Sequence, residues 1–373
     1  MTSQVAIRKC DDYDYARVTD AVHATLSSLG GIGAYIRSGQ KVLIKPNMLS
    51  AKSPDRAVTT HPAVLEAVIR EAQQAGGEVR VGDSPSAVFR GLARYWEATG
   101  YRAVAERTGV PLLNFEAGGT IARMIDGSEY HLARHVLEAD VVINLPKMKT
   151  HGLTLYTGAV KNLYGCLPGF QKARYHKLYP KPEDFSRVLV DIYTCIRPVL
   201  TVMDAVFAME GNGPSTGSSR RVGLILASAD GIALDAVANR IMGYKPGEVH
   251  TTRIAGERGV GESDLDRIRI GGPGIESVAL SDFVLPPTHL LRWVPRGLVR
   301  WAGRFLWVKP RTDVSRCTGC GVCARACPVR AIEMKDGLPV TDYDLCINCM
   351  CCNESCPEGA VYQEMSWLAR RFS

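Results

Sequence analysis

Between residues 40 and about 280, short apolar runs alternate with segments whose apolar residues recur every three or four positions. The runs are typical of buried strands, and the wider spacing is typical of amphipathic helices. The clearest helix is expected from Pro62 to Ala75, because Pro62 suits a first turn and two glycines follow the pattern. The alternation predicts an α/β domain with a mostly parallel, helix-flanked sheet. Strands are expected at 41–44, 79–81, 112–115, 141–145, 200–206 and 222–227, helices at 87–98 and 232–242, and a hairpin at 121–132.

Polar residues follow four of the expected strands directly. Ligands of open α/β sheets bind beyond the carboxyl ends of the strands, so these residues are expected to line one cleft. Lysines there would hold a carboxylate or phosphate, a histidine would deliver a proton near neutral pH, and carboxylates would orient these groups. The candidate catalytic residues are Asp83, Lys147, Lys149, His151, Asp204 and Glu210. The candidate substrate-binding residues are Lys45, Asn47, Lys161, Asn162, Gly211 and Gly213.

Two local features of this edge also favour an anion. Gly211 and Gly213 permit positive φ and a close approach of the backbone to a ligand. Residues 157–162 read as the start of a helix whose free amides would attract negative charge. The alternative is that these lysines are only solvated, because lysines in loops after strands are more often solvated than functional.

Eight of the twelve cysteines form two copies of the spacing Cys-x2-Cys-x2-Cys-x3-Cys-Pro. This run is typical of two-cluster ferredoxins, in which the fourth thiolate of each copy binds the other cluster. Zinc sites and disulfides fit such a run less well. Cys351 lies outside the spacing and is expected to be a bystander thiol. The predicted ligands are Cys317, Cys320, Cys323 and Cys356 for one [4Fe–4S] cluster, and Cys346, Cys349, Cys352 and Cys327 for the other.

The segment from 311 to 363 is expected to be a small ferredoxin-like α+β domain. Residues 327–332 resemble residues 356–361, and Asp336-Gly337 between them predicts a hairpin turn. So short a segment buries little apolar surface, so cluster ligation must supply most of its stability. The rest of the chain divides into an α/β domain at 1–283, a linker at 284–310 and a tail at 364–373.

The linker is basic and aromatic. From Arg296 onward arginines recur every four residues, while Trp301, Phe305 and Val308 share another stripe. This pattern predicts a basic amphipathic helix. A helix over 290–309 would either attach to an anionic membrane surface or pack against the acidic cluster domain. We favour packing, because exposed tryptophans are rarer than buried ones.

Composition points to the cytoplasm. Residues 1–20 are polar, and no run of 18 uncharged apolar residues occurs, so neither a secretory signal nor a spanning helix is expected. Thiolate-bound clusters indicate a reducing compartment. The formal net charge of +7 counts cysteines as neutral, and we expect no nucleic-acid partner. No P-loop or flavin or nicotinamide fingerprint is present in the sequence.

As a set, these motifs resemble a family of proteins of unknown function that are catalogued as iron–sulfur cluster-binding proteins. The resemblance covers most of residues 40–362, and residues 146–152 are its most specific part. It implies an α/β domain fused to a C-terminal two-[4Fe–4S] ferredoxin domain, and it implies no particular reaction. The other segments that carry it are 45–47, 60–62, 82–85, 157–162, 204–213 and the cysteine repeat.

From the residues themselves we expect a cytoplasmic oxidoreductase of the ferredoxin type. Electrons from a donor protein, such as a ferredoxin or a reductase, would pass through two clusters to a small anionic substrate. A substrate with an activated double bond would suit the two stored electrons. Two alternatives stay open: a non-enzymatic electron carrier that docks a partner enzyme, and an assembly factor in which the clusters are structural.

Overall fold

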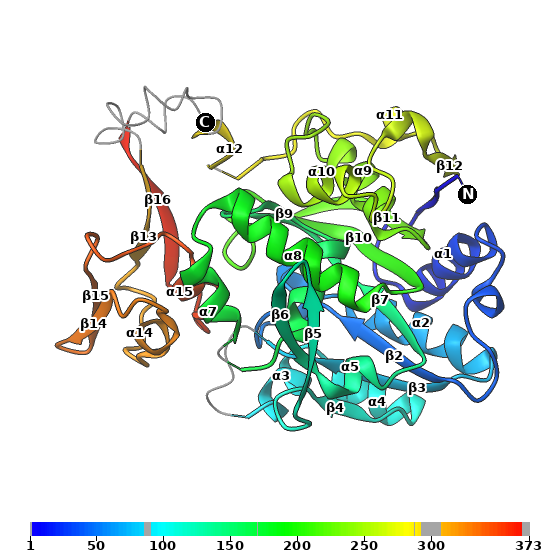
Figure 1. Ribbon diagram of the computed structural model, residues 1–373, viewed down its shortest axis with the longest axis horizontal. Coiled ribbons are helices and arrows are strands. Elements are labelled where there is room, and N and C mark those ends of the chain that lie inside the picture. The colour runs from blue at the N-terminus through cyan, green and yellow to red at the C-terminus, as the bar shows by residue number, and fades with distance from the viewer. Residues whose placement is uncertain (1, 86–90, 170, 287, 292–306, 368–373) are drawn as a thin grey trace.

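The computed structural model describes residues 2–85, 91–169, 171–286, 288–291 and 307–367. A large α/β domain is followed by a small domain that carries the cysteine repeat. Figure 1 shows the small domain, in orange and red, beside helix α7 of the large one. The fold class expected from the sequence is confirmed.

The central sheet is mostly parallel. Its strand order is β12-β1-β11-β10-β7-β2-β3-β4, and β8 lies beside β10 with β9 beside β8. Three of the pairs run antiparallel: β1 with β11, β10 with β11, and β8 with β9. The strands are β1 (Gln4–Lys9), β2 (Lys41–Pro46), β3 (Glu78–Asp83), β4 (Leu112–Asn114), β7 (Val141–Leu145), β8 (Lys147–His151), β9 (Leu155–Thr157), β10 (Leu200–Glu210), β11 (Ser218–Ser228) and β12 (Arg269–Gly271).

Helices cover both faces of this sheet (Figure 1). Alternation along β2 explains why, since Val42 and Ile44 pack against α1, α2 and α4 while Leu43 joins the cluster around α6 and α8. The helices are α1 (Tyr15–Ser27), α2 (Pro62–Gln74), α3 (Ala93–Ala98), α4 (Tyr101–Thr108), α5 (Arg134–Leu137), α6 (Ala159–Asn162), α7 (Gln171–Leu178), α8 (Pro182–Ile196), α9 (Gly231–Ile241), α10 (His250–Glu257), α11 (Ile275–Val278) and α12 (Thr288–Leu291).

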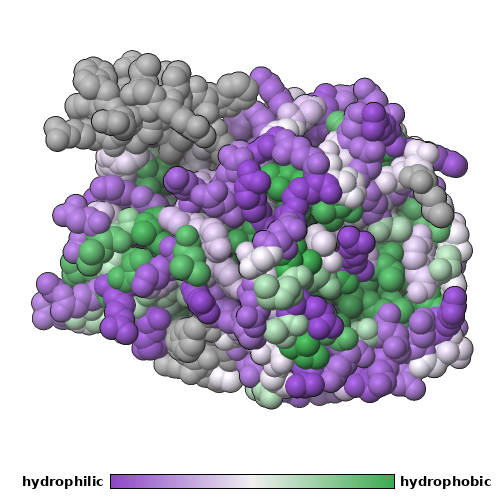
Figure 2. Space-filling view, in the orientation of Figure 1, coloured by the Kyte–Doolittle hydropathy of each residue, from purple (hydrophilic) through white to green (hydrophobic). Residues whose placement is uncertain are grey.

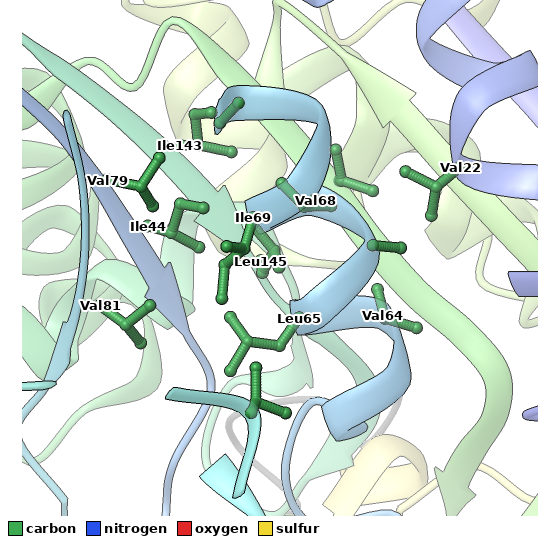
Figure 3. Close-up of a cluster of buried hydrophobic side chains, with 14 of the residues drawn as sticks. Val22, Ile44, Val64, Leu65, Val68, Ile69, Val79, Val81, Ile143 and Leu145 are labelled. Atoms are coloured by element: carbon green, nitrogen blue, oxygen red, sulfur yellow. The ribbon is translucent and has the colours of Figure 1, made fainter. Parts of the chain in front are cut away.

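Helix α2 follows its sequence pattern closely. His61 caps it by accepting from the Ala63 amide at 3.2 Å, and Pro62 occupies its first turn. Figure 3 shows its apolar face, including Leu65 and Ile69, packed against strand residues of the sheet. Each fully buried side chain of this size contributes about 1.5–3 kcal/mol.

The main departure from expectation is residues 147–151. They were expected as part of a loop after β7, but they form strand β8, which pairs with β10 and β9 and is buried throughout. Its polar side chains find partners inside the protein, which offsets the cost of burying them. The hairpin at 121–132 is confirmed as β5 (Thr120–Ile125) and β6 (Ser128–Ala133). Of the helix expected at 87–98, α3 covers the second half, and residues 86–90 lie outside the described residues.

The small domain repeats itself in structure as well as in sequence. Asp336 and Gly337 form the expected hairpin turn with positive φ. Three further pairs of residues, each 29 positions apart, also have positive φ in both copies: 319 and 348, 321 and 350, and 330 and 359. Its elements are β13 (Val308–Thr312), α14 (Val322–Ala326), β14 (Ile332–Lys335), β15 (Leu338–Thr341), α15 (Cys351–Ser355) and β16 (Val361–Met365).

The predicted amphipathic helix falls mostly on residues 292–306, outside the described residues. Among the helices that the structure does describe, none is both long enough and apolar enough to span a bilayer.

Candidate functional site

A cavity of about 160 Å³ lies between the carboxyl edge of the sheet and the small domain. Its walls come from the ends of β2, β3 and β8, from α6 and α7, and from α14 and α15 across the domain boundary. The small domain contributes Ala326, Cys351, Glu354 and Ser355. Of the residues predicted from the sequence, Lys45, Asn47, Asp83, Lys149, His151, Lys161 and Asn162 line this cavity.

Lys45 and Asp83 form a neutral pair in the wall. The Lys45 Nζ lies 2.8 Å from Asp83 Oδ1 and also donates to the Pro46 carbonyl at 3.0 Å. Both side chains are almost fully buried. Burial raises the pKa of Asp83, while the adjacent ammonium and the Met48 amide oppose that rise. The pair carries no net charge, so it contributes to the shape of the cavity and not to its net charge.

Lys149 is a buried lysine without a carboxylate. Its Nζ donates to Asn47 Oδ1 at 2.9 Å and to the Val58 carbonyl at 2.7 Å. In the described part of the chain, no carboxylate oxygen lies within 4.0 Å of that nitrogen. Burial, and then the nearby charge of Lys161, hold the pKa of Lys149 well below its usual range. An anion bound in the cavity would stabilise the protonated form of Lys149 and so raise its pKa.

Lys161 lies at the end of α6, with its Nζ 4.9 Å from the centre of the Tyr164 ring. Burial lowers its pKa, and the carboxylate of Glu354 opposes that lowering most strongly. A cation over an aromatic ring is stabilised without being neutralised. When protonated, Lys149 and Lys161 would therefore give one part of the cavity an excess of positive charge.

Lys172 was not found from the sequence. It lies in α7, where its Nζ donates to the Ser84 carbonyl at 3.0 Å and contacts the Ser84 hydroxyl. Ser84 in turn contacts Glu116. Burial lowers the pKa of Lys172 to about 8. No strand end or motif marks this lysine, because only the packing of α7 brings it to the cavity.

His151 points across the domain boundary. Its Nδ1 accepts from the Leu153 and Thr154 amides, at 3.0 and 3.3 Å, which assigns the ring proton to Nε2. Nε2 lies 3.0 Å from Glu354 Oε1. Burial lowers the pKa of His151 to about 4. The ring is therefore neutral at pH 7 and donates to Glu354, whereas the sequence predicted a group that titrates near neutral pH.

Glu354 is the most important residue that the sequence did not reveal. Burial alone would raise its pKa, but Lys161 and His151 hold that pKa below its usual range, so the group is ionised. Two further contacts hold the domains together beside it: Ser215 donates to the Asn353 carbonyl at 3.0 Å, and Gln363 donates to the Gly213 carbonyl at 3.2 Å.

Five predicted site residues do not line the cavity. Lys147 and Asp204 form a fully buried ion pair at 2.8 Å, to which the Tyr13 hydroxyl adds a hydrogen bond. Glu210 accepts from the Val284 amide, and Gly213 packs on Thr150. Gly211 has the expected positive φ, of 70°, without facing the cavity.

The amides at the start of α6 are also occupied. Asp235 accepts from the Ala159 and Val160 amides at 2.7 and 3.0 Å. These amides therefore bind a carboxyl group of the protein itself, and burial raises the pKa of that Asp235 carboxyl to about 7. This corrects the expectation that the helix start would face a ligand.

The cysteines of the first predicted set lie together. One small cavity is lined by Cys317, Cys320, Cys323 and Cys356. Burial raises the pKa of Cys352 well above its usual range, and the nearby thiols of Cys349, Cys346, Cys323 and Cys327 raise it further. In equivalent positions of the two copies, the Ala331 amide donates to Cys327 Sγ and the Ala360 amide to Cys356 Sγ, both at 3.2 Å. Such amides stabilise thiolates, so the donor set fits [4Fe–4S] ligation. Cys351 instead lines the larger cavity.

The contact between His151 and Glu354 can be tested by a double-mutant cycle. Replacing Glu354 by Ala leaves a buried donor unpaired, and we expect it to lower the free energy of unfolding by about 3 kcal/mol. His151→Ala should also destabilise, and the double variant should cost less than the sum by about 1–3 kcal/mol. Urea unfolding measures all three. Glu358→Ala, at an exposed position, is the control. Strictly additive costs would show that the two side chains do not interact.

Comparison with known proteins gives the family. Residues 42–240 match the Domain of unknown function (DUF362), and residues 310–333 match a 4Fe-4S binding domain. A thylakoid-associated protein of Synechocystis sp. is 36% identical over 253 residues, which cover 67% of this chain and 78% of that protein. The lactate racemase apoprotein of Thermoanaerobacterium thermosaccharolyticum aligns at a TM-score of 0.40 and 11% identity, over 63% of this chain and 56% of the racemase. The chain thus belongs to the DUF362 family and joins that domain to a 4Fe-4S binding domain.

Proposed function

We propose that this protein is an iron–sulfur oxidoreductase that passes electrons to a small anionic substrate. The observation that carries the proposal is that one cavity is walled both by the lysines of the DUF362 domain and by helix α15, which holds Cys352. Substrate and redox centre would then be neighbours. A carrier that only docks partner enzymes has no need of a cavity at this place.

We propose two [4Fe–4S] clusters, with the ligand sets predicted from the spacing. The repeat of positive φ values and of amide-to-sulfur hydrogen bonds in both copies supports two equivalent sites. When bound, two clusters would supply two electrons, one at a time.

The electrons would come from a low-potential donor protein, such as a ferredoxin or a reductase. Exposed apolar side chains on the small domain offer it a docking surface, among them Val314, Val340, Leu345 and Tyr362. Figure 2 shows hydrophobic residues gathered over the small domain. Apolar side chains grouped at a surface commonly mark interaction sites.

The cavity's own charges would bind the substrate. Four lysines line it, against three carboxylates: Lys45, Lys149, Lys161 and Lys172 face Asp83, Glu116 and Glu354. Lys149 and Lys161 would hold a carboxylate or phosphate group and stabilise negative charge that develops during reduction. In a closed site such fixed charges act more strongly than in water.

Reduction of an activated double bond takes up two electrons and two protons. Lys172, with a pKa of about 8, is mostly protonated at neutral pH and is a suitable donor of one proton, and water would supply the other. His151 would instead keep Glu354 and the small domain in place. Lys45 and Asp83 would fix the floor of the site.

Turnover can be tested without knowing the natural substrate. Reduced methyl viologen would donate electrons, and acrylate and crotonate would serve as unsaturated carboxylate probes. We expect carboxylate-dependent viologen oxidation, and a loss of at least about tenfold in kcat/KM for Lys149→Met, because one substrate charge loses its partner. Lys177→Met, at an exposed position of α7, should match the unchanged protein. The proposal fails if neither carboxylate is reduced, or if Lys149→Met reduces them as well as the control does.

The same assay predicts a pH dependence. Lys172 carries its charge below a pKa of about 8 and loses it above, so kcat/KM for crotonate should fall as pH rises through that value. The fall should approach about tenfold per pH unit. Lys172→Met should lower the plateau and remove this inflection. An unchanged inflection in that variant would assign it to another group.

We also propose a cytoplasmic location with peripheral membrane contact through residues 290–309. The thylakoid-associated relative supports such contact, and the arginines and tryptophans of this segment suit an anionic surface. Co-sedimentation with vesicles of anionic lipid at low salt tests it. We expect binding that weakens as salt is raised and that is absent with neutral vesicles. Equal recovery in the supernatant with both vesicle types would remove the membrane proposal.

A further inference from the structure

A lysine of the large domain reaches the turn that follows Cys356 in the small domain. Lys52 lies between β2 and α2, and its Nζ donates to the Ser215 carbonyl at 2.8 Å. The same nitrogen lies 3.2 Å from the point that a Cβ would occupy on Gly359. Gly359 is three positions beyond Cys356, which is a predicted cluster ligand. An ammonium group of the DUF362 domain is therefore a neighbour of a cluster-binding turn.

The turn itself is short and bonded to Cys356. The Gly359 amide donates to the Cys356 carbonyl at 3.2 Å, and the Ala360 amide donates to Cys356 Sγ, also at 3.2 Å. Cys356 is buried. Because these bonds lie within five consecutive residues, a charge beside Gly359 is also close to the sulfur atom of Cys356.

A second cation lies at the same turn. Arg316 donates from Nη2 to the Glu358 carbonyl at 3.0 Å, and that nitrogen is 3.3 Å from the point that a Cβ would occupy on Gly359. With glycine at this position, no side chain separates the two cations from the turn. In the described part of the chain, no carboxylate oxygen lies within 4.0 Å of the side-chain nitrogens of Lys52 or Arg316. The turn therefore carries positive charge that no ion pair neutralises.

The equivalent turn of the other copy is charged differently. Arg330 stands 29 positions before Gly359 and also has positive φ, of 55°. Its amide donates to the Cys327 carbonyl at 3.2 Å, as the Gly359 amide does to that of Cys356. The Arg330 side chain is exposed, so water and salt screen its charge. Lys52 is therefore expected to act mainly on the cluster that Cys356 binds.

The charge of Lys52 is only partly screened by solvent. The side chain is half-buried, and burial lowers its pKa to about 8, so it is mostly protonated at pH 7. A charge that is shielded from water acts more strongly on its neighbours than one in bulk solvent. An iron–sulfur cluster gains one negative charge when it is reduced, and nearby charge is one determinant of its potential. A cation at this place would therefore stabilise the reduced form.

We propose that Lys52 raises the reduction potential of the cluster whose ligands are Cys317, Cys320, Cys323 and Cys356. Lys52 would act on this cluster through space and not on the substrate, so it is not a catalytic residue. This inference rests on the ligand sets of the proposed function and does not depend on turnover. The large domain would thereby set the potential of a cluster that lies in the small domain.

A redox titration of the full chain with its clusters, followed by electron paramagnetic resonance, tests the assignment. Lys52→Gln removes the charge and keeps an N–H donor for the Ser215 carbonyl. We expect reduction of one cluster to become about tenfold less favourable, which lowers its midpoint potential by about 59 mV for one electron. Lys52→Arg keeps the charge and should keep the potential. Lys177→Met, at an exposed position of α7, should match the unchanged protein.

The affected cluster can be identified through its ligands. Cys317→Ser should alter or remove the signal of the cluster that Cys317 binds, and Cys346→Ser should do the same for the other cluster. The signal that Cys317→Ser changes is the one whose potential should fall in Lys52→Gln.

Three results would overturn the inference: unchanged potentials in Lys52→Gln, a shift that is equal in both clusters or confined to the one that Cys346 binds, or an equal shift in Lys52→Arg. The viologen assay separates this inference from the proposed function. If the potential falls in Lys52→Gln but no carboxylate is reduced, the role of Lys52 stands and the oxidoreductase proposal fails. If carboxylates are reduced and the potentials do not change, the reverse holds.

Discussion

The burial of lysine ammonium groups at the edge of the sheet is the constraint on which the rest of this structure depends. Lys45 and Lys149 are each only 1% exposed, and Lys172 is 8% exposed. Removing such charges from water is costly unless partners replace the solvent. Lys45 has Asp83, and Lys172 has Ser84, but Lys149 has only neutral oxygens. The charged form of Lys149 is therefore the least stabilised of the three, and a bound anion would stabilise it.

The small domain completes this arrangement. Its Glu354 is the carboxylate that most opposes the lowering of the Lys161 pKa and accepts from His151, and its helix α15 forms one wall of the cavity. Cluster ligation is expected to stabilise that domain, so the lysines and the clusters depend on one another through a shared boundary. A ligand in the cavity would touch both domains at once. Under the proposed function, binding and electron transfer would then occur in one place.

Much of this fold could be predicted from the sequence, because the patterns that determine its elements extend over only a few neighbouring residues. The apolar face of α2 and the turn at Asp336-Gly337 each depend on a few neighbouring residues, and each appears where expected. The site is predicted less completely. Lys147, Lys149 and His151 share one face of β8, yet about 13 Å of strand separates the first from the last. Lys147 meets Asp204 within the sheet, and only the others reach the cavity.

The residues that sequence reasoning missed depend on distant packing. His151 and Glu354 are 203 positions apart, and nothing near either residue signals the other. Lys172 and His176 enter the cavity only because α7 packs against it. Asp235 was missed for the same reason, and its two bonds to the start of α6 replace the ligand anion expected there.

The central claim is that a bound anion and a redox centre are neighbours in this cavity. Electron paramagnetic resonance of the dithionite-reduced protein, with and without saturating propionate, tests it directly. Propionate has no reducible double bond, so any change reports on proximity alone. The account predicts that propionate alters the signal of one cluster and leaves the other unchanged. Superimposable spectra, under conditions where calorimetry shows propionate bound, would contradict it.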